Sequence, residues 1–333
     1  MWNKILELTK STKLSDIHIH SDLQISYREF GEIVKTNDYC SSEDIKKFLL
    51  EILSEFAFKK FEQKLDYDFA IQKNEFRYRV NVFKENEKLA LILRKIESKI
   101  PNFEDLNLPA YIRTIPSISN GLVLVTGPTG SGKSTTIASI IDVINSTQKG
   151  HILTIEDPIE FKHNSKLSLI SQREVGRDTK SFTSALRASL REDPDVILVG
   201  ELRDLETIQL ALTAAETGHL VFGTLHTNSA PATINRIIDV FPSAQQSQIR
   251  SQLASTLRCV LTQNLFKRID KSGRVAAYEM MVCNTAIKNL IRENKLFQIQ
   301  NVMQTAKSEG MILMQNYIRN LVNEKKISAE YLI

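Results

Sequence analysis

The most informative stretch of the sequence is Gly127-Pro128-Thr129-Gly130-Ser131-Gly132-Lys133-Ser134-Thr135. It matches the pattern G-x-x-x-x-G-K-[ST] in full, after the apolar run 122–125 and before a helix-like segment, 136–144. Glycines let the backbone wrap around a phosphate, so that amide N–H groups and a helix N-terminus point at it. We therefore predict a phosphate-binding loop in which Lys133 reaches the β- and γ-phosphates of a nucleotide and Ser134 ligates Mg²⁺.

Three further apolar runs of strand length follow this loop, at residues 152–155, 196–199 and 220–225. Their apolar residues are consecutive rather than alternating, which is typical of strands buried on both faces inside a parallel sheet. Ligands of such sheets bind beyond the carboxyl ends of the strands. The residues directly after each run are therefore the candidates for chemistry.

Acidic residues follow the next two runs. Glu156-Asp157-Pro158-Ile159-Glu160 comes after 152–155, and hydrolysis of ATP needs one carboxylate to orient and deprotonate water. A solvated acidic turn is the alternative for this segment. Glu201 follows 196–199 in the strand-then-acid pattern of a Walker B element, whose carboxylate meets Mg²⁺. Because many apolar runs end in an acid, this assignment depends on its position after the phosphate-binding loop.

Histidines flank the last run, with His219 before 220–225 and His226 after it. A histidine at the end of such a strand can hydrogen-bond a γ-phosphate or a carboxylate and so report its presence. The alternative is an ordinary hydrogen-bonded histidine at a strand end.

The first hundred residues predict a small mixed α/β domain. Strand-like runs occupy 16–20, 24–27, 76–83 and 89–93, and helical spacing of apolar residues predicts one helix over 41–61. Two prolines among turn-forming residues then mark a connector. The expected domains are 1–98, a linker at 99–110, and 111–333 with a helical region at its C-terminal end.

The composition is that of an ordinary soluble globular protein, with 25% charged and 42% hydrophobic residues among 333. The 43 basic and 39 acidic residues give a net charge of +4 that is spread along the chain, so nucleic-acid binding is not expected. No secretory signal or run of about 18 apolar residues is visible. Three cysteines without a C-x-x-C pair predict reduced thiols rather than a zinc site. We expect a cytoplasmic protein.

Together these motifs closely resemble the secretion ATPase superfamily and, within it, the type IV pilus retraction ATPases of the PilT family. Extension and type II secretion ATPases usually carry a long N-terminal extension and a four-cysteine zinc module, and we expect neither in this protein. Residues 286–293 (AIKNLIRE) resemble the AIRNLIRE segment associated with retraction, with Lys288 in place of Arg. The segments that carry the resemblance are 15–19, 79–83, 127–135, 154–161, 191–201, 212–226 and 286–293.

The resemblance implies an α/β fold, with a PAS-like N-terminal α+β domain followed by a RecA-like P-loop ATPase domain that has a mostly parallel sheet. It also implies a homohexamer that holds ATP and Mg²⁺ between subunits. The residues assigned to nucleotide binding are Gly127, Pro128, Thr129, Gly130, Ser131, Gly132, Lys133, Ser134, Thr135, Glu156 and His219, and those assigned to the metal are Ser134 and Glu201.

Catalytic roles are likewise implied by the resemblance. Glu160 is similar to the family's catalytic base, Glu201 to its Walker B acid, and His226, with His219, to its His box. Arg79 and Arg94 resemble the arginines that extend from the N-terminal domain towards the phosphates. The alternative for these two arginines is a pair of surface charges on strands.

The implied function is a hexameric motor ATPase that drives type IV pilus retraction and twitching motility. Its expected partners are an inner-membrane platform protein and an extension or accessory retraction ATPase, with only indirect membrane contact. Three alternatives stay open: an accessory pilus or type II secretion ATPase, a nucleic-acid translocase, and an inactive scaffold that binds nucleotide.

Overall fold

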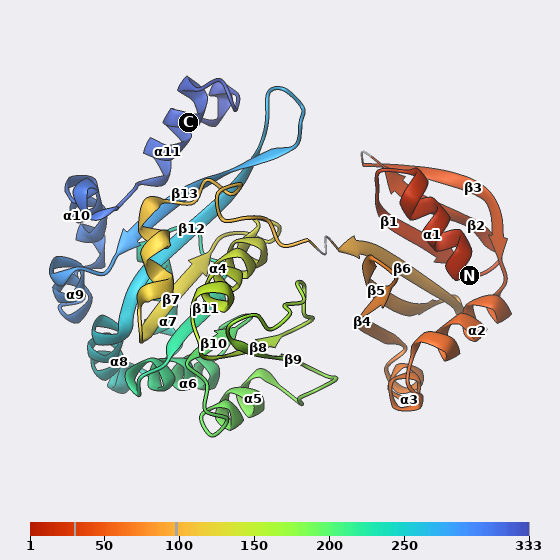
Figure 1. The fold of residues 1–333 in the computed structure, drawn as a ribbon, viewed down its shortest axis with the longest axis horizontal. Helices are drawn as coiled ribbons and strands as arrows, with labels where there is room; N and C mark the ends of the chain where they lie inside the picture. The colour runs from red at the N-terminus through yellow and green to blue at the C-terminus, as the bar shows by residue number, and fades with distance from the viewer. Residues whose placement is uncertain (30, 97–98, 333) are drawn as a thin grey trace. The chain divides into compact units, whose positions relative to one another are not determined.

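The computed structural model describes residues 1–29, 31–96 and 99–332. The chain forms two compact units, Met1–Lys99 and Ile100–Ile333, each with its own sheet (Figure 1). The domain boundary expected at residue 98 falls within 97–98, which lie outside the described residues.

The first unit contains a six-stranded antiparallel sheet in the order β3-β2-β1-β6-β5-β4. The expected strands are present, but β3 and β4 at the two edges were missed because they are rich in charged and polar residues. The strands are β1 (Leu14–His20), β2 (Leu23–Glu29), β3 (Glu32–Cys40), β4 (Asp66–Lys73), β5 (Phe76–Glu85) and β6 (Lys88–Ile96).

Three helices, α1 (Trp2–Ser11), α2 (Ser42–Ile52) and α3 (Glu55–Lys64), complete this unit. The prediction of a single helix over 41–61 is wrong, because the backbone is extended at Leu53 and a second helix, α3, begins after it. Ser54 begins the second helix, since its side chain accepts the Ala57 N–H at 3.2 Å as an N-cap. The buried core includes Ile5, Ile17, Ile19, Phe48, Phe61, Val80, Leu91 and Leu93.

The second unit contains a seven-stranded sheet in the order β13-β12-β7-β11-β10-β8-β9, parallel except for the β12–β13 pair. The four predicted apolar runs are strands β7, β8, β10 and β11, so the predicted fold class is confirmed. The strands are β7 (Gly121–Thr126), β8 (His151–Glu156), β9 (Leu169–Glu174), β10 (Val196–Val199), β11 (Leu220–Leu225), β12 (Leu257–Lys267) and β13 (Arg274–Val282).

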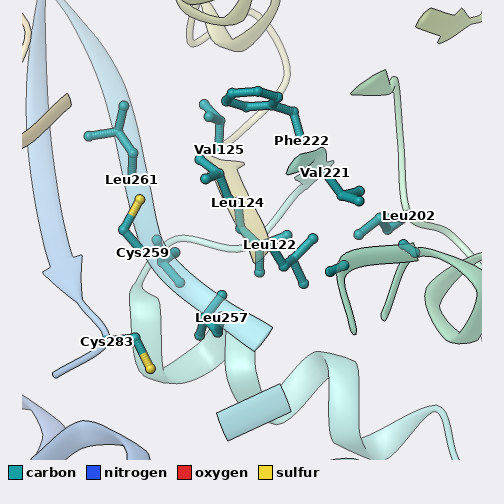
Figure 2. Close-up of a cluster of buried hydrophobic side chains, with 14 of the residues drawn as sticks. Leu122, Leu124, Val125, Leu202, Val221, Phe222, Leu257, Cys259, Leu261 and Cys283 are labelled. Atoms are coloured by element: carbon teal, nitrogen blue, oxygen red, sulfur yellow. The ribbon is translucent and has the colours of Figure 1, made fainter. Parts of the chain in front are cut away.

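Helices cover this sheet, and its central strands are buried. All six residues of β7 and of β11 are buried. Figure 2 shows side chains of β7, β11 and β12 packed together in the core, among them Leu124, Phe222 and Cys259. The helical segments are η1 (Ala110–Ser117), α4 (Lys133–Thr147), α5 (Phe182–Ser189), α6 (Leu205–Glu216), α7 (Ala230–Asp239), α8 (Ser243–Thr256), α9 (Thr285–Arg292), η2 (Leu296–Gln298), α10 (Ile299–Thr305), η3 (Lys307–Glu309), α11 (Met314–Asn323) and η4 (Ala329–Tyr331).

Within the described part of the chain, no helix combines the length and the apolar character that crossing a membrane requires.

Candidate active site

The phosphate-binding loop connects β7 to α4 at the carboxyl edge of the parallel strands (Figure 1). Gly127, Gly130 and Gly132 have φ angles of 140°, 76° and 91°, which residues with a side chain rarely adopt. A Cβ on Gly127 would collide with the Gln263 carbonyl oxygen, and one on Gly132 would lie 2.7 Å from Gln263 Nε2. Glycine is therefore needed both for the course of the loop and for its close approach to β12.

Lys133 is the first residue of α4, and its side chain turns back into the loop. Its Nζ donates to the carbonyl oxygens of Gly127 at 2.8 Å and Pro128 at 3.0 Å. Burial lowers the pKa of Lys133, while the nearby carboxylates of Glu201 and Glu160 act in the opposite direction. The two acids thus lie near enough to act on the charge of the lysine, although they follow different strands.

Glu201 follows β10, and its two carboxylate oxygens contact the side chains of Arg203 and His226. Its Oε2 lies 2.7 Å from Arg203 Nη2, and its Oε1 lies 3.4 Å from His226 Nε2. His226 follows β11, which pairs in parallel with β10, so the two strand ends deliver the acid and the histidine to one place. Sequence reasoning missed Arg203, although its E-x-R spacing from Glu201 could have indicated the contact.

The two histidines of the last predicted motif lie at opposite ends of β11. The His219 carbonyl accepts the Gly121 N–H at 3.0 Å, where β7 and β11 begin, and its Nδ1 contacts the Ala214 carbonyl at 2.9 Å. A six-residue strand, at about 3.3 Å per residue, separates this point from His226 by about 20 Å. Within one chain, His226 therefore lies at the site and His219 does not.

Glu156, the last residue of β8, is held by protein partners. Its Oε1 accepts hydrogen bonds from Thr154 Oγ1 at 2.7 Å and Gln172 Nε2 at 3.2 Å. Burial raises the pKa of Glu156 to about 7, despite these hydrogen bonds. The residue lines a cavity of about 40 Å³ together with Ser134 and Thr224, so it lies beside the loop.

The segment that carries Glu160 is anchored by β9, a strand that sequence reasoning missed. The Ile159 N–H donates to Glu174 Oε2 at 3.1 Å, and the His163 N–H donates to Gln172 Oε1 at 2.8 Å. These bonds hold the backbone on both sides of Glu160. No sequence signal pointed to Gln172 or Glu174, because their partners are set by strand pairing.

Arg79 and Arg94 lie in the first unit, directly opposite each other on β5 and β6. Arg79 forms an ion pair with Asp68, and Arg94 Nε donates to Asp16 Oδ1 at 2.7 Å. Burial alone would raise the pKa of Asp16, but hydrogen bonds from Arg94 and Ser15 lower it below its usual value. Both arginines are exposed and engaged with acids of their own sheet.

Ser134 and Glu201 offer a hydroxyl and a carboxylate oxygen, which are the hard ligands that Mg²⁺ prefers. In the described ranges, no group of three or more His, Cys, Asp or Glu side chains is placed to hold a metal. Mg²⁺ often binds through one or two carboxylates plus the phosphates of a nucleotide, keeping several waters. The residues present fit that mode rather than a metal site made by the protein alone.

A complete phosphate-binding loop at the carboxyl edge of a mostly parallel sheet, with acids from two further strands beside its lysine, defines a P-loop ATPase. The family model described as "Type II/IV secretion system protein" matches residues 1–332. The chain belongs to this family.

Individual relatives are similar along most of the chain. It is 46% identical over 329 residues to "Type IV pilus retractation ATPase PilT" of Pseudomonas aeruginosa, covering 98% of this chain and 95% of that protein. It is 50% identical over 291 residues to "Twitching motility protein" of Neisseria gonorrhoeae, covering 87% and 78% respectively. A crystal structure of "the Pilus Retraction Motor PilT and Bound ADP" superposes with a TM-score of 0.93 at 46% identity, covering 99% of this chain and 95% of that one.

Proposed function

We propose that this chain is the motor ATPase of type IV pilus retraction, which hydrolyses ATP to disassemble the pilus and power twitching motility. The observation that carries the proposal is the complete phosphate-binding loop with Lys133 turned into it, in a chain that matches a retraction ATPase over nearly its whole length. An accessory pilus or type II secretion ATPase stays the alternative.

Binding of the nucleotide follows from the loop's own geometry. The backbone N–H groups of 127–135 and the N-terminus of α4 bind the phosphates, since both present partial positive charge to an anion. Lys133 Nζ exchanges the carbonyl oxygens of Gly127 and Pro128 for phosphate oxygens. The ammonium then lies where it neutralises the β- and γ-phosphates.

Hydrolysis is assigned to Glu160 as general base. Its carboxylate orients and deprotonates the attacking water, and the backbone on both sides of it is fixed by Glu174 and Gln172. Glu156 is a poorer candidate, because its Oε1 is occupied by Thr154 and Gln172.

Ser134 and Glu201 are assigned to Mg²⁺, which when bound supplies charge neutralisation to the β- and γ-phosphate oxygens. Glu201 also holds His226 through the 3.4 Å contact between Oε1 and Nε2. A change in the charge near Glu201 during hydrolysis therefore acts on His226, and through it on β11.

The remaining assignments require an oligomer, which we propose is a homohexamer with nucleotide between subunits. Arg79 and Arg94 would supply phosphate-facing charge from a neighbouring subunit after leaving Asp68 and Asp16. His219, about a strand's length from its own P-loop, would contribute at such an interface. The ring would work in the cytoplasm, peripheral to the inner membrane, on a platform protein, with an extension or accessory retraction ATPase as further partner.

The test is phosphate release by the purified chain with Mg²⁺ and ATP, compared with Lys133→Ala. We expect release and ATP binding by the wild type and loss of both in the variant, because the loop loses its only lysine. Equal rates for the two proteins would overturn the proposal.

Deletion and complementation in cells distinguish a retraction motor from the alternative functions. Deletion should leave abundant pili that do not retract, and the wild type but not Lys133→Ala should restore twitching. Normal retraction after deletion would instead indicate an accessory ATPase, and stimulation of ATP hydrolysis by DNA would indicate a translocase.

A further inference from the structure

The side chain of Gln263, on β12, is buried and hydrogen-bonds the phosphate-binding loop. Its Nε2 donates to the Ser131 carbonyl at 2.6 Å, and its Oε1 accepts the Thr136 hydroxyl at 2.8 Å. Ser131 lies inside the loop and Thr136 in the first turn of α4. One amide therefore fixes the loop and the helix that follows it, from a strand outside every motif recognised in the sequence.

The contact is close on both sides of the loop. A Cβ at Gly127 would strike the Gln263 backbone, and one at Gly132 would lie 2.7 Å from its Nε2. The loop therefore packs directly against Gln263, and its glycines provide the space that this close contact requires. Because Gln263 is 3% exposed, water is not at hand to replace a broken bond.

A second buried residue extends this contact away from the loop. Tyr278 lies directly opposite Gln263 in the β12–β13 ladder, so the two buried side chains are neighbours on one face of the sheet. The Tyr278 hydroxyl donates to the Leu106 carbonyl at 2.8 Å. Leu106 belongs to the connector segment, residues 101–109, which follows the first unit in the chain.

We propose that Gln263 is a positioning residue for the phosphate-binding loop, and that Gln263, with Tyr278 opposite it, couples the loop to the connector segment at Leu106. The reason is that both side chains are buried and hydrogen-bonded, so a shift of Gln263 must move its neighbour Tyr278 or leave a buried polar group without its partner. The inference rests on the proposed nucleotide site and adds a route from that site to the connector segment.

Tyr317, on α11, offers a matched control. Its hydroxyl donates to the Asn107 carbonyl at 3.0 Å, and its ring packs edge-on against Tyr278 with centroids 5.4 Å apart. It thus bonds the same connector segment through the same chemical group. Tyr317, however, lies on α11, whereas Tyr278 lies opposite Gln263 in the ladder.

The positioning role is tested by the affinity for a fluorescent ATP analogue with Mg²⁺. Gln263→Leu removes both bonds, so we expect its Kd to rise about tenfold, and Thr136→Val removes one, so we expect a rise of about threefold. A lower Tm with unchanged Kd in both variants would show that Gln263 only stabilises the fold. If Gln263→Leu does not fold, Thr136→Val decides by the same criterion.

The coupling is tested by hydrogen–deuterium exchange of the connector-segment amides with and without ADP. In the wild type and in Tyr317→Phe we expect ADP to slow exchange there. In Tyr278→Phe we expect that protection to fall at least about threefold, because one buried bond is removed. Equal protection in Tyr278→Phe and Tyr317→Phe, or none in an ADP-bound wild type, would overturn the coupling. A wild type that binds neither nucleotide would instead refute the proposed function.

Discussion

The antiparallel sheet of the first unit and the mostly parallel sheet of the second place their charges differently. In the first, Asp16, Arg94 and Arg79 lie side by side across neighbouring strands, on the sheet itself. In the second, β7 and β11 are buried throughout, and the charged groups beside Lys133 come only after the strands end. A sheet covered on both faces leaves its strand ends as the place for charged chemistry, whereas a sheet with an open face can carry charge along its strands.

The largest expected effect lies at the strand ends. Glu160→Gln should lower kcat by about 100-fold to 10,000-fold while ATP still binds, because a general base is removed without altering the loop. Phosphate release and the affinity for a fluorescent ATP analogue check this. The control is Glu206→Gln, an exposed acid on α6 that pairs with Arg187, and it should leave kcat unchanged. Full activity in Glu160→Gln would remove that residue from catalysis.

The next effect concerns the buried strands of the second unit. Phe222→Ala, at a fully buried position of β11, should lower the free energy of unfolding by about 3–5 kcal/mol through lost burial and a cavity. Urea unfolding followed by circular dichroism measures the change. The chain's only tryptophan, Trp2, lies in the first unit's core, so its fluorescence should report an unaltered transition there. A shift of both signals by the same amount would show that the units unfold together.

Glu156 in the second unit and Asp16 in the first have pKa values shifted in opposite directions, so the pH dependence of stability tests the comparison between the two units. Burial raises the pKa of Glu156 from 4.5 to about 7, so the folded chain holds this proton more tightly than the unfolded chain between these values. Its contribution to stability is full below about pH 4.5 and is lost as pH rises to about 7, by about 3 kcal/mol at most. Glu156→Gln should remove this loss, measured by urea unfolding at several pH values.

Asp16 is the control for that experiment, because Arg94 and Ser15 lower its pKa. Its stabilising contribution is present above the unfolded-state pKa and is lost as pH falls, so Asp16→Asn should flatten the acid side instead. The same pH dependence in both variants would contradict the assigned environments.

The smallest effect is expected on the charged sheet. Arg79→Ala breaks an ion pair with Asp68 in which both side chains are exposed, so the free energy of unfolding should change by less than about 1 kcal/mol. Lys88→Ala, which breaks the exposed pair with Asp22, should behave alike. Trp2 fluorescence during urea unfolding measures both. If Arg79→Ala lowered the free energy of unfolding as much as Phe222→Ala, Arg79 would be a structural residue, which would contradict its proposed role at the nucleotide.

The same contrast explains how much of the fold was readable from the sequence. Strands buried on both faces are continuous apolar runs, so β7, β8, β10 and β11 were predicted. Strands β3, β4, β9, β12 and β13 were not predicted. At the edges, exposure on one side or more admits Glu, Lys, Asp and Gln, and in the interior strand β12 the apolar residues are interrupted by Arg258, Thr262, Gln263 and Asn264. The helix predicted over 41–61 failed for a local reason, since periodicity did not reveal the N-cap at Ser54.

The site divides in a similar way. The positions of Lys133, Glu160, Glu201 and His226 followed from motifs directly after strands, and the structure brings these residues together. Gln263 could not be predicted, because its partner Ser131 is 132 residues away in the sequence. Such a contact becomes visible only when strand order places β12 beside β7.

The two internal bonds of Lys133 bear on the cost of keeping a cation in a buried place. The carbonyl oxygens of Gly127 and Pro128 solvate its ammonium, so the charge is not isolated within the protein. A neutral side chain at this position would leave those two oxygens without their donor, and would disturb the backbone of the loop as well as remove a charge.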